Sequence, residues 1–347
     1  MSDLTQRAPP THRTMKLLPS LLKKFGAFIA LCLLAARVLA ADPFPSKPVM
    51  LMVPYPAGGL SDVVARLVNN PLSKQLGQPV LVENLGGVSG ALAAQKVLGA
   101  PADGYYLFQG SPNELILAPL ANAAIKFKSE DFRLVQMIGV APMVILARKD
   151  LPANTADELV TLARSVAKTK PLTFGSVGFG SFYHVLGEHM AQTLGAPMTH
   201  VPYKGGAPLM QDLGGGQLDF VILPVSQQQV ALAEQGRIKI IASINATRTD
   251  LAALKSIPTV NEGKLLKGFN FSIWTGYFVR KGTPEEVVQR LAKSLTGVLS
   301  DAGVRSQLEA QNMLVAQPVS EAEADKTYQA ETARYRAIAK ANNLQPQ

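Results

Sequence analysis

The sequence predicts an α/β fold with mostly parallel sheets, and two similar segments about 120 residues apart carry this prediction. In each segment an apolar run of strand length enters a glycine-rich turn, and a hydroxyl residue then precedes apolar residues at helical spacing. The first segment covers residues 49–70 and the second covers residues 172–194. Strands and helices also alternate along the rest of the chain, which favours parallel strands with helices packed on the sheet.

The first glycine-rich turn, residues 53–62, reads Val-Pro-Tyr-Pro-Ala-Gly-Gly-Leu-Ser-Asp. Gly58 and Gly59 can adopt a positive φ and let a bound group approach the backbone closely. Ser61 is expected to cap the following helix, with Asp62 in its first turn. Such a helix start directs free N–H groups at one point, which suits an anion. Two glycines also close many turns that bind nothing, so a purely structural role stays an open alternative.

The other elements follow from apolar runs and helical spacing. Strands are predicted at residues 50–53, 80–83, 106–109, 144–147, 172–175, 218–223 and 238–243, with extended chain at 269–279. Helices are predicted at residues 62–76, 91–98, 115–120, 155–167, 182–194, 209–213, 225–235, 284–299 and 320–341. Pro71 is expected to kink or restart the first helix, and Gly77 to end it. Thr283 and Pro284 are expected to start a later helix, with proline at its first position.

Residues 1–41 are predicted to be a secretory signal peptide. Five lysines and arginines in residues 1–24 precede twelve uncharged apolar residues at 25–36, and small residues follow at Ala40 and Ala41. Twelve residues span about 18 Å as a helix, well short of the ~30 Å hydrocarbon core, so a retained membrane anchor is not expected. Cleavage leaves about 306 residues, a length typical of two domains.

The composition of the mature chain argues against several function classes. The single cysteine, Cys32, lies in the predicted signal peptide, so no thiol or disulfide chemistry is expected afterwards. Cleavage lowers the net charge from +9 to +4, with 28 basic against 24 acidic residues. No basic cluster with interleaved aromatics indicates nucleic-acid binding. The first turn has neither G-x-G-x-x-G nor a Gly-Lys-Ser/Thr ending, so a nucleotide-phosphate loop is not expected.

The second turn, residues 176–181, reads Ser-Val-Gly-Phe-Gly-Ser and is the physical counterpart of the first. In open α/β sheets, ligands bind beyond the carboxyl ends of strands, where such turns lie. Two lobes facing each other would therefore form a cleft with a helix N-terminus on each wall. A third turn, at residues 203–206, contains Tyr203 and Lys204, and Lys204 can either contact a ligand or remain solvated.

Motifs of a known family recur, in the family's order, through nearly the whole mature chain. They are residues 54–59 with Asp62, Ala65 and Arg66; 76–80; 82–84; 175–176 with Gly178, Gly180, Ser181, His184 and Glu188; 200–205; 214–219; 258–260 with Glu262; and Trp274, Gly276 and 282–284. Together they resemble the Bug family, the extracytoplasmic solute receptors of tripartite tricarboxylate transporters. One position departs from the family pattern, because Leu85 stands where the family usually has a basic residue.

The resemblance implies a two-lobed type II periplasmic binding protein, or Venus flytrap. Each lobe is expected to be a mostly parallel sheet flanked by helices, with two strand crossings as the hinge. Residues 42–142 and 272–347 would form lobe 1, and residues 143–271 would form lobe 2. The resemblance further implies a periplasmic protein without catalysis and without a cofactor. We also expect the protein to be a monomer.

The ligand that the resemblance implies is a small organic carboxylate: a di- or tricarboxylate, an amino acid or an aromatic acid. The receptor would deliver it to the membrane permease of a tripartite transporter or to a sensor protein. In the family, amides, hydroxyls and ordered waters of the two turns clasp one carboxylate. The candidate ligand-binding residues are therefore Tyr55, Pro56, Ala57, Gly58, Gly59, Ser61, Asp62, Ser176, Gly178, Phe179, Gly180, Ser181, His184, Tyr203 and Lys204.

Several residues have a second interpretation. Asp62 can accept a hydrogen bond from the ligand or support the Gly58-Gly59 turn, and Trp274 is expected to pack in the core or support the hinge. His184 can touch the ligand, although a histidine early in a helix more often packs there. With Glu188 and His200 it could also be imagined as a metal ligand, but the spacing is not that of a zinc site.

The enzyme alternative is a secreted α/β serine hydrolase with Ser181 or Ser176 as the nucleophile. The second turn does not have the G-x-S-x-G pattern of that class, and no base is evidently paired with either serine.

Overall fold

The computed structural model describes residues 43–341 and 344–346. The predicted signal peptide, residues 1–41, lies outside the described residues. The chain divides into two units between Ser46 and Lys47, and everything below concerns the unit that begins at Lys47.

This unit contains a ten-stranded mixed sheet in the order β2-β1-β3-β9-β4-β7-β5-β6, and β8 and β10 also pair with β4. The strands are β1 (Val49–Val53), β2 (Val80–Asn84), β3 (Tyr106–Gly110), β4 (Phe132–Arg148), β5 (Thr173–Ser176), β6 (Thr199–Pro202), β7 (Phe220–Pro224), β8 (Ile238–Ser243), β9 (Ser272–Arg280) and β10 (Leu314–Val315). The predicted parallel pairing is confirmed between β1 and both β2 and β3, and between β5 and both β6 and β7. The sheet is mixed because β4 and β9 run antiparallel to their neighbours.

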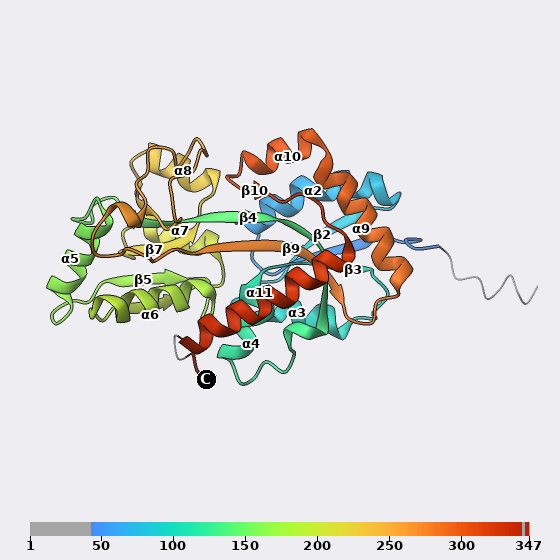
Figure 1. The fold of residues 1–347 in the computed structure, drawn as a ribbon, viewed down its shortest axis with the longest axis horizontal. Helices are drawn as coiled ribbons and strands as arrows, with labels where there is room; N and C mark the ends of the chain where they lie inside the picture. The colour runs from blue at the N-terminus through green and yellow to red at the C-terminus, as the bar shows by residue number, and fades with distance from the viewer. Residues whose placement is uncertain (1–42, 342–343, 347) are drawn as a thin grey trace, which may run out of the picture. The chain divides into compact units, whose positions relative to one another are not determined.

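Strand β4 connects two parts of the sheet. As far as Pro142 it pairs with β9, and from Met143 it pairs with β7 and from Val144 with β8. We call the part with β1, β2, β3, β9 and β10 sheet A, and the part with β5, β6, β7 and β8 sheet B. Figure 1 shows β4 and β9 side by side between the helices α5–α8 at one end and α2, α3, α9 and α10 at the other.

Helices cover both parts of the sheet. They are α2 (Leu60–Leu76), α3 (Ala91–Gly99), α4 (Ala118–Ala121), α5 (Ala156–Val166), α6 (Phe182–Leu194), α7 (Gly206–Gly214), α8 (Gln227–Glu234), α9 (Glu285–Ser300), α10 (Ala302–Glu309) and α11 (Glu321–Ala341). Single turns lie at η1 (Val88–Gly90), η3 (Ser129–Asp131) and η4 (Val260–Glu262), and η2 (Asn113–Leu117) is a π-helical turn. The predicted helix at 115–120 is thus divided between η2 and α4, and α10 was not predicted.

Local details of the helix ends differ from the prediction at three points. Gly59, not Ser61, is the N-cap of α2, and Ser61 lies inside the first turn. Helix α2 continues as one helix through Pro71 to Leu76, so the predicted alternative of a restart is wrong, and Gly77 ends the helix as predicted, in the left-handed conformation. Pro284 is the N-cap of α9 rather than its first helical residue.

The core of the unit joins sheet A to α11. Trp274 is 4% exposed, packs near Phe278 and Tyr328, and donates from Nε1 to Glu331 of α11 at 2.8 Å. This confirms the core-packing interpretation of Trp274.

Among the described residues, none of the helices combines the length and the apolar character that crossing a membrane requires.

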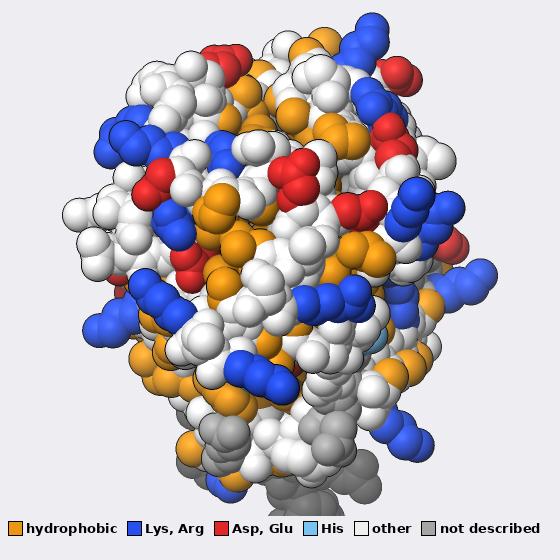
Figure 2. All heavy atoms as spheres, turned by 90° about the vertical axis from the view of Figure 1, so that its left-hand side faces the viewer, with side chains coloured by type: hydrophobic (Ala, Val, Ile, Leu, Met, Phe, Trp, Pro, Cys, Tyr) orange, Lys and Arg blue, Asp and Glu red, His pale blue; other side chains and the backbone are white. Residues whose placement is uncertain are grey.

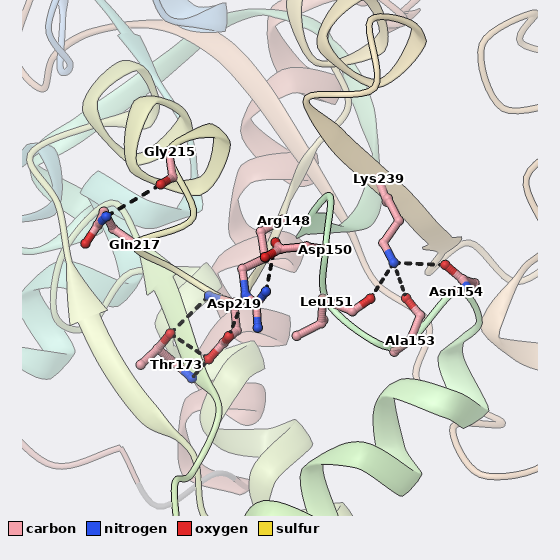
Figure 3. A network of polar contacts seen from close by, with 10 residues as sticks. All are labelled: Arg148, Asp150, Leu151, Ala153, Asn154, Thr173, Gly215, Gln217, Asp219 and Lys239. Carbon is pink, nitrogen blue, oxygen red and sulfur yellow. Dashed lines mark hydrogen bonds and ion pairs between the residues drawn. The ribbon is translucent and has the colours of Figure 1, made fainter.

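A polar network fixes the outer end of sheet B (Figure 3). Asp219 accepts from Arg148 Nε at 2.9 Å and from both the N–H and the hydroxyl of Thr173 at 2.8 and 3.0 Å. Lys239 Nζ donates to the carbonyls of Leu151 and Ala153. These bonds tie β4, β5, β7 and β8 together away from the glycine-rich turns.

On the face drawn in Figure 2, lysine and arginine side chains are spread among acidic ones rather than gathered in one patch.

Candidate functional site

A cavity of about 100 Å³ lies where residues of sheet A and sheet B approach each other, with room for several waters or one small organic molecule. Its lining from the sheet A side is Pro54, Tyr55, Gly59, Leu60, Ser61, Val64, Gln109, Gly110, Ser111, Asn113, Glu114, Ala141, Ile273, Thr275 and Met313. From the sheet B side it is Val177, Tyr183, Gly206, Met210, Leu223, Pro224, Ser226, Gln228 and Gln229. None of these lining residues is a lysine, arginine or histidine, and Glu114 is the one that can carry a charge. An anion here would have to be held by neutral donors.

The start of α2 supplies such donors. Gly59 is an extended N-cap with no side-chain capping bond, and the first helical bond runs from Val63 N to Gly59 O at 3.1 Å. The N–H groups of the residues between them precede that bond and point out of the helix start. The helix dipole adds partial positive charge at the same place. Because Gly59, Leu60 and Ser61 line the cavity, the uncapped helix start faces it.

Asp62 stabilises the first glycine-rich turn through hydrogen bonds of its carboxylate. It is 4% exposed, and its Oδ2 accepts from Gly58 N and from Arg66 Nε, both at 3.0 Å. Burial opposes ionisation of the carboxyl, but the hydrogen bonds from Arg66 and Gly58 outweigh it and lower the pKa of Asp62. These contacts fit the second interpretation of Asp62, in which it holds the Gly58-Gly59 turn in place.

A buried carboxyl group lies beside the first turn. Glu114 is fully buried and accepts from the hydroxyl of Tyr55, from Ser111 N at 2.6 Å and from Ser111 Oγ at 2.7 Å. Burial raises the pKa of Glu114 to about 7, even though the bonds from Tyr55 and Ser111 favour the ionised form. Burial and the adjacent Glu114 also raise the pKa of Tyr55 well above its usual value. Among the described residues no lysine or arginine forms an ion pair with Glu114, so its charge state follows pH near neutrality.

The start of α6 is built differently. The hydroxyl of Ser181 caps the helix by accepting from His184 N, and Gly180 N donates to His184 Nδ1 at 3.1 Å. Phe182 N donates to Asn113 Oδ1 at 2.6 Å. Two N–H groups of this helix start, those of Phe182 and His184, are therefore already bonded within the protein.

The glycines of the second turn allow close packing against sheet A residues. An added Cβ would lie 2.5 Å from Ser89 Oγ at Gly178 and 2.0 Å from the Cβ of Ala121 at Gly180. Ser89 Oγ also donates to the carbonyl of Phe179 at 2.7 Å. The second turn thus sits directly on η1 and α4.

Two histidines pack behind this turn. His184 and His200 stack with ring centroids 4.0 Å apart, and His200 Nε2 lies 2.7 Å from Ser176 Oγ. Burial lowers the pKa of both, to about 3 for His184, where His200 adds to the effect, and to about 4 for His200. Both rings are therefore neutral at physiological pH, which agrees with a packing role for His184.

Three of the predicted site residues line the cavity, namely Tyr55, Gly59 and Ser61. The second and third turns contribute through neighbours of the predicted residues, Val177 and Gly206. The other predicted residues are not among the lining, and their ligand contacts stay predictions: Pro56, Ala57, Gly58, Asp62, Ser176, Gly178, Phe179, Gly180, Ser181, His184, Tyr203 and Lys204.

Two of these residues have clear structural contacts. Pro56 packs against Gly86 and Gly205, where an added Cβ would lie 2.7 Å from its Cδ in either case. The hydroxyl of Tyr203 donates to Asp212 at 2.8 Å.

Four polar residues that line the cavity were not predicted as site residues, namely Gln109, Asn113, Glu114 and Thr275. Residues 111–114 directly precede the helix predicted at residues 115–120. The available signal was a group of polar residues directly after strand β3, at the strand end where ligands bind in such sheets.

Comparison with known proteins identifies the family of this chain. Residues 64–344 match the family described as the tripartite tricarboxylate transporter family receptor. The chain belongs to this family. A protein from the TAR-I ttuE-ttuC' intergenic region of Agrobacterium vitis is 40% identical over 280 residues, which cover 79% of each chain.

Solved structures that are similar to this chain have the same fold. The periplasmic binding protein BugD is 29% identical and superposes with a TM-score of 0.80, covering 88% of this chain and 100% of BugD. MatC from Rhodopseudomonas palustris, solved with bound malate, is also 29% identical, with a TM-score of 0.78 over 85% of this chain and 99% of MatC. The predicted Bug-family resemblance and α/β binding-protein fold are confirmed.

Membership makes this chain a solute-binding receptor and not an enzyme. The hydrolase alternative finds no support in the geometry either. Ser176 does have a histidine partner, but it is fully buried and does not line the cavity, and Ser181 is bonded as a helix cap. Among the described residues no group of three histidine, cysteine or acidic side chains is arranged to hold a metal ion.

Proposed function

We propose that this receptor captures a small organic carboxylate in the cavity and that the carboxylate binds at the start of α2. The uncapped first turn of this helix, facing a cavity without basic side chains, carries the proposal. Free N–H groups and the helix dipole stabilise a negative charge at such a place without an arginine or lysine. The malate bound by MatC, a structural neighbour, supports a di- or tricarboxylic acid as the ligand class.

The two parts of the sheet are proposed to act as two lobes that close on the ligand. Lobe 1 comprises residues 42–142 and 272–347, and lobe 2 comprises residues 143–271. The change of strand partners between Pro142 and Met143, and the start of β9 at Ser272, support these boundaries. The second turn already packs on η1 and α4 in this structure, and this packing is proposed to belong to the closed state.

The receptor is proposed to act as a monomer in the periplasm after removal of residues 1–41. There it would deliver its ligand to the membrane permease of a tripartite transporter or to a sensor protein. Family membership supports the transporter, and the charged, apolar and small-residue order of residues 1–41 supports export.

The amide site can be tested by removing one N–H group. Leu60 is the first residue of α2, where proline is well tolerated because its N–H is not needed by the helix. Leu60→Pro should lower the affinity for a bound dicarboxylate at least about tenfold relative to Leu60→Ala, because hydrogen bonds to charged groups contribute roughly 1.5–3 kcal/mol. Leu60→Ala keeps the N–H and controls for loss of the side chain.

Affinities would be measured by isothermal titration calorimetry with succinate, malate and citrate, and with the matching amides as negative controls. Equal affinities of the proline and alanine variants would place the carboxylate elsewhere. Binding of the amides as tightly as the acids would contradict carboxylate recognition itself. Ester hydrolysis by the purified protein that disappears in Ser176→Ala would contradict the receptor function.

A further inference from the structure

Gln109, one of the residues that line the cavity, has a buried amide oxygen without a partner among the described residues. Gln109, in β3, is 3% exposed, and its Nε2 donates to the carbonyl of Ser61 at 2.7 Å. Because a carbonyl can only accept, this bond fixes which end of the amide is the nitrogen. The other end, Oε1, has no hydrogen-bond partner among the described residues. An amide oxygen left buried and unpaired is destabilising, which points to a donor that binds there.

A second unpaired polar atom lies in the same wall. Gln109 is opposite Tyr277 in the β3–β9 pair, and Thr275 is two residues from Tyr277 along β9. Side chains at these positions share one face of a sheet and are diagonal neighbours. Thr275 also lines the cavity, and its Oγ1 is buried without a partner among the described residues.

We propose that Gln109 and Thr275 form a second subsite that accepts a hydrogen bond from a donor group on the ligand. The receptor would then select acids that carry a hydroxyl or ammonium group over the unsubstituted acids of the same length. This inference rests on the proposed carboxylate site at the start of α2.

The subsite lies next to that carboxylate site. The amide nitrogen of Gln109 donates a hydrogen bond to Ser61, which is in the first turn of α2. The free oxygen belongs to the same amide group, so it lies close to the start of this helix. The donor group of the ligand is therefore close to the carboxylate, on the first or second carbon from it. Gln109 Oε1 can only accept, whereas the Thr275 hydroxyl can donate or accept, so a donor on the ligand satisfies both.

The test compares ligands that differ by one group. Malate and aspartate carry a hydroxyl and an ammonium group on the carbon where succinate carries only hydrogen. Wild-type protein should bind malate or aspartate about tenfold or more tightly than succinate, because succinate leaves the buried oxygens unpaired. Titration calorimetry on the full mature chain gives each affinity directly.

Thr275→Val isolates the subsite, because the hydroxyl it removes has no partner within the described protein. It should reduce the preference for the substituted acid to a few-fold or less, while Thr275→Ser should retain it. Gln109→Met should also reduce the ratio of the affinity for the substituted acid to the affinity for succinate. Because both affinities are measured on the same variant, the loss of the hydrogen bond to Ser61 affects both and cancels in this ratio.

Tyr277→Phe is the matched control. Its hydroxyl is also buried and unpaired among the described residues, but Tyr277 does not line the cavity, so the preference should not change. Equal binding of all three acids by the wild type would overturn the subsite and leave the carboxylate proposal intact. A preference that survives both Thr275→Val and Gln109→Met, or that is lost in Tyr277→Phe, would also overturn it. Binding of no acid at all would instead contradict the proposed function.

Discussion

The starts of α2 and α6 follow the same sequence plan but offer different chemistry. Each follows a strand and a glycine-rich turn, and each has a serine near its first residue. At α2 the serine lies inside the helix, no side chain caps the start, and the turn faces the cavity. At α6 the serine caps the helix, and Asn113 and His184 bond two further N–H groups.

This difference shows that a helix start is available to a ligand only where side chains of the protein leave its N–H groups unbonded. The serine at the N-cap of α6 satisfies one orphan N–H group from within the protein, and Asn113 satisfies another. A serine two residues later leaves them free, so the same strand–turn–helix pattern can make either a binding site or a packing contact. Glycines differ in the same way, because Gly58 faces open space whereas Gly180 lies against Ala121.

The two glycines give the largest expected effect. Both have positive φ, +88° at Gly58 and +74° at Gly180, so alanine is strained at either position. Gly180→Ala should lower the free energy of unfolding by about 4 kcal/mol, because its Cβ also meets the Cβ of Ala121 at 2.0 Å. Gly58→Ala should cost only about 1–2 kcal/mol, since nothing lies within 4 Å. Urea denaturation measures both, and equal losses would contradict the packing role of Gly180.

Much of this comparison could be predicted from the sequence because its signals are local. Helix α6 spans residues 182–194 as predicted, with the predicted hydroxyl cap, because a cap and helical spacing act within a few residues. Strand β8 also has its predicted bounds. Gly77 closes α2 for the same kind of local reason.

The missing parts depend on contacts between distant segments. Only residues 144–147 of the 17-residue strand β4 were predicted, because Gly139 and Pro142 interrupt the apolar run and pairing with β9 depends on residues far along the chain. Glu114 and Thr275 could not be assigned to the cavity for a similar reason. Each reaches it only when β3 and β9 pair and η2 folds against the first turn.

The ionisable groups near the two helix starts give the second prediction. Glu114, near α2, has a pKa of about 7 in the folded chain, whereas an ordinary glutamate has 4.5. Between these values the folded chain keeps a proton that the unfolded chain has released, so the free energy of unfolding falls as pH rises through this window. The shift from 4.5 to about 7 corresponds to a loss of roughly 3 kcal/mol at pH 8 relative to pH 4.5.

Glu114→Gln cannot ionise, so the difference between wild type and variant across pH 4.5–8 isolates this group. For His184 and His200, near α6, the dependence of stability on pH has the opposite sign. Their folded pKa values lie below 6.5, so they contribute stability above pH 6.5 that is lost as pH falls toward 4 and then 3. A wild-type-minus-variant difference that stays constant from pH 4.5 to 8 would show that Glu114 is not held protonated.

The two serines give the smallest but most specific effect. Ser181→Ala removes a buried cap and should lower the free energy of unfolding by about 1 kcal/mol, with little change in ligand affinity. Ser61→Ala should change stability by less than about 0.5 kcal/mol, because Ser61 caps nothing, yet weaken dicarboxylate binding roughly threefold to tenfold if its hydroxyl contacts the ligand. Chemical denaturation and calorimetry on the same preparations separate the two readouts. Loss of affinity in Ser181→Ala with unchanged stability would instead make the second turn a ligand site of equal rank, and the contrast between the two helix starts would disappear.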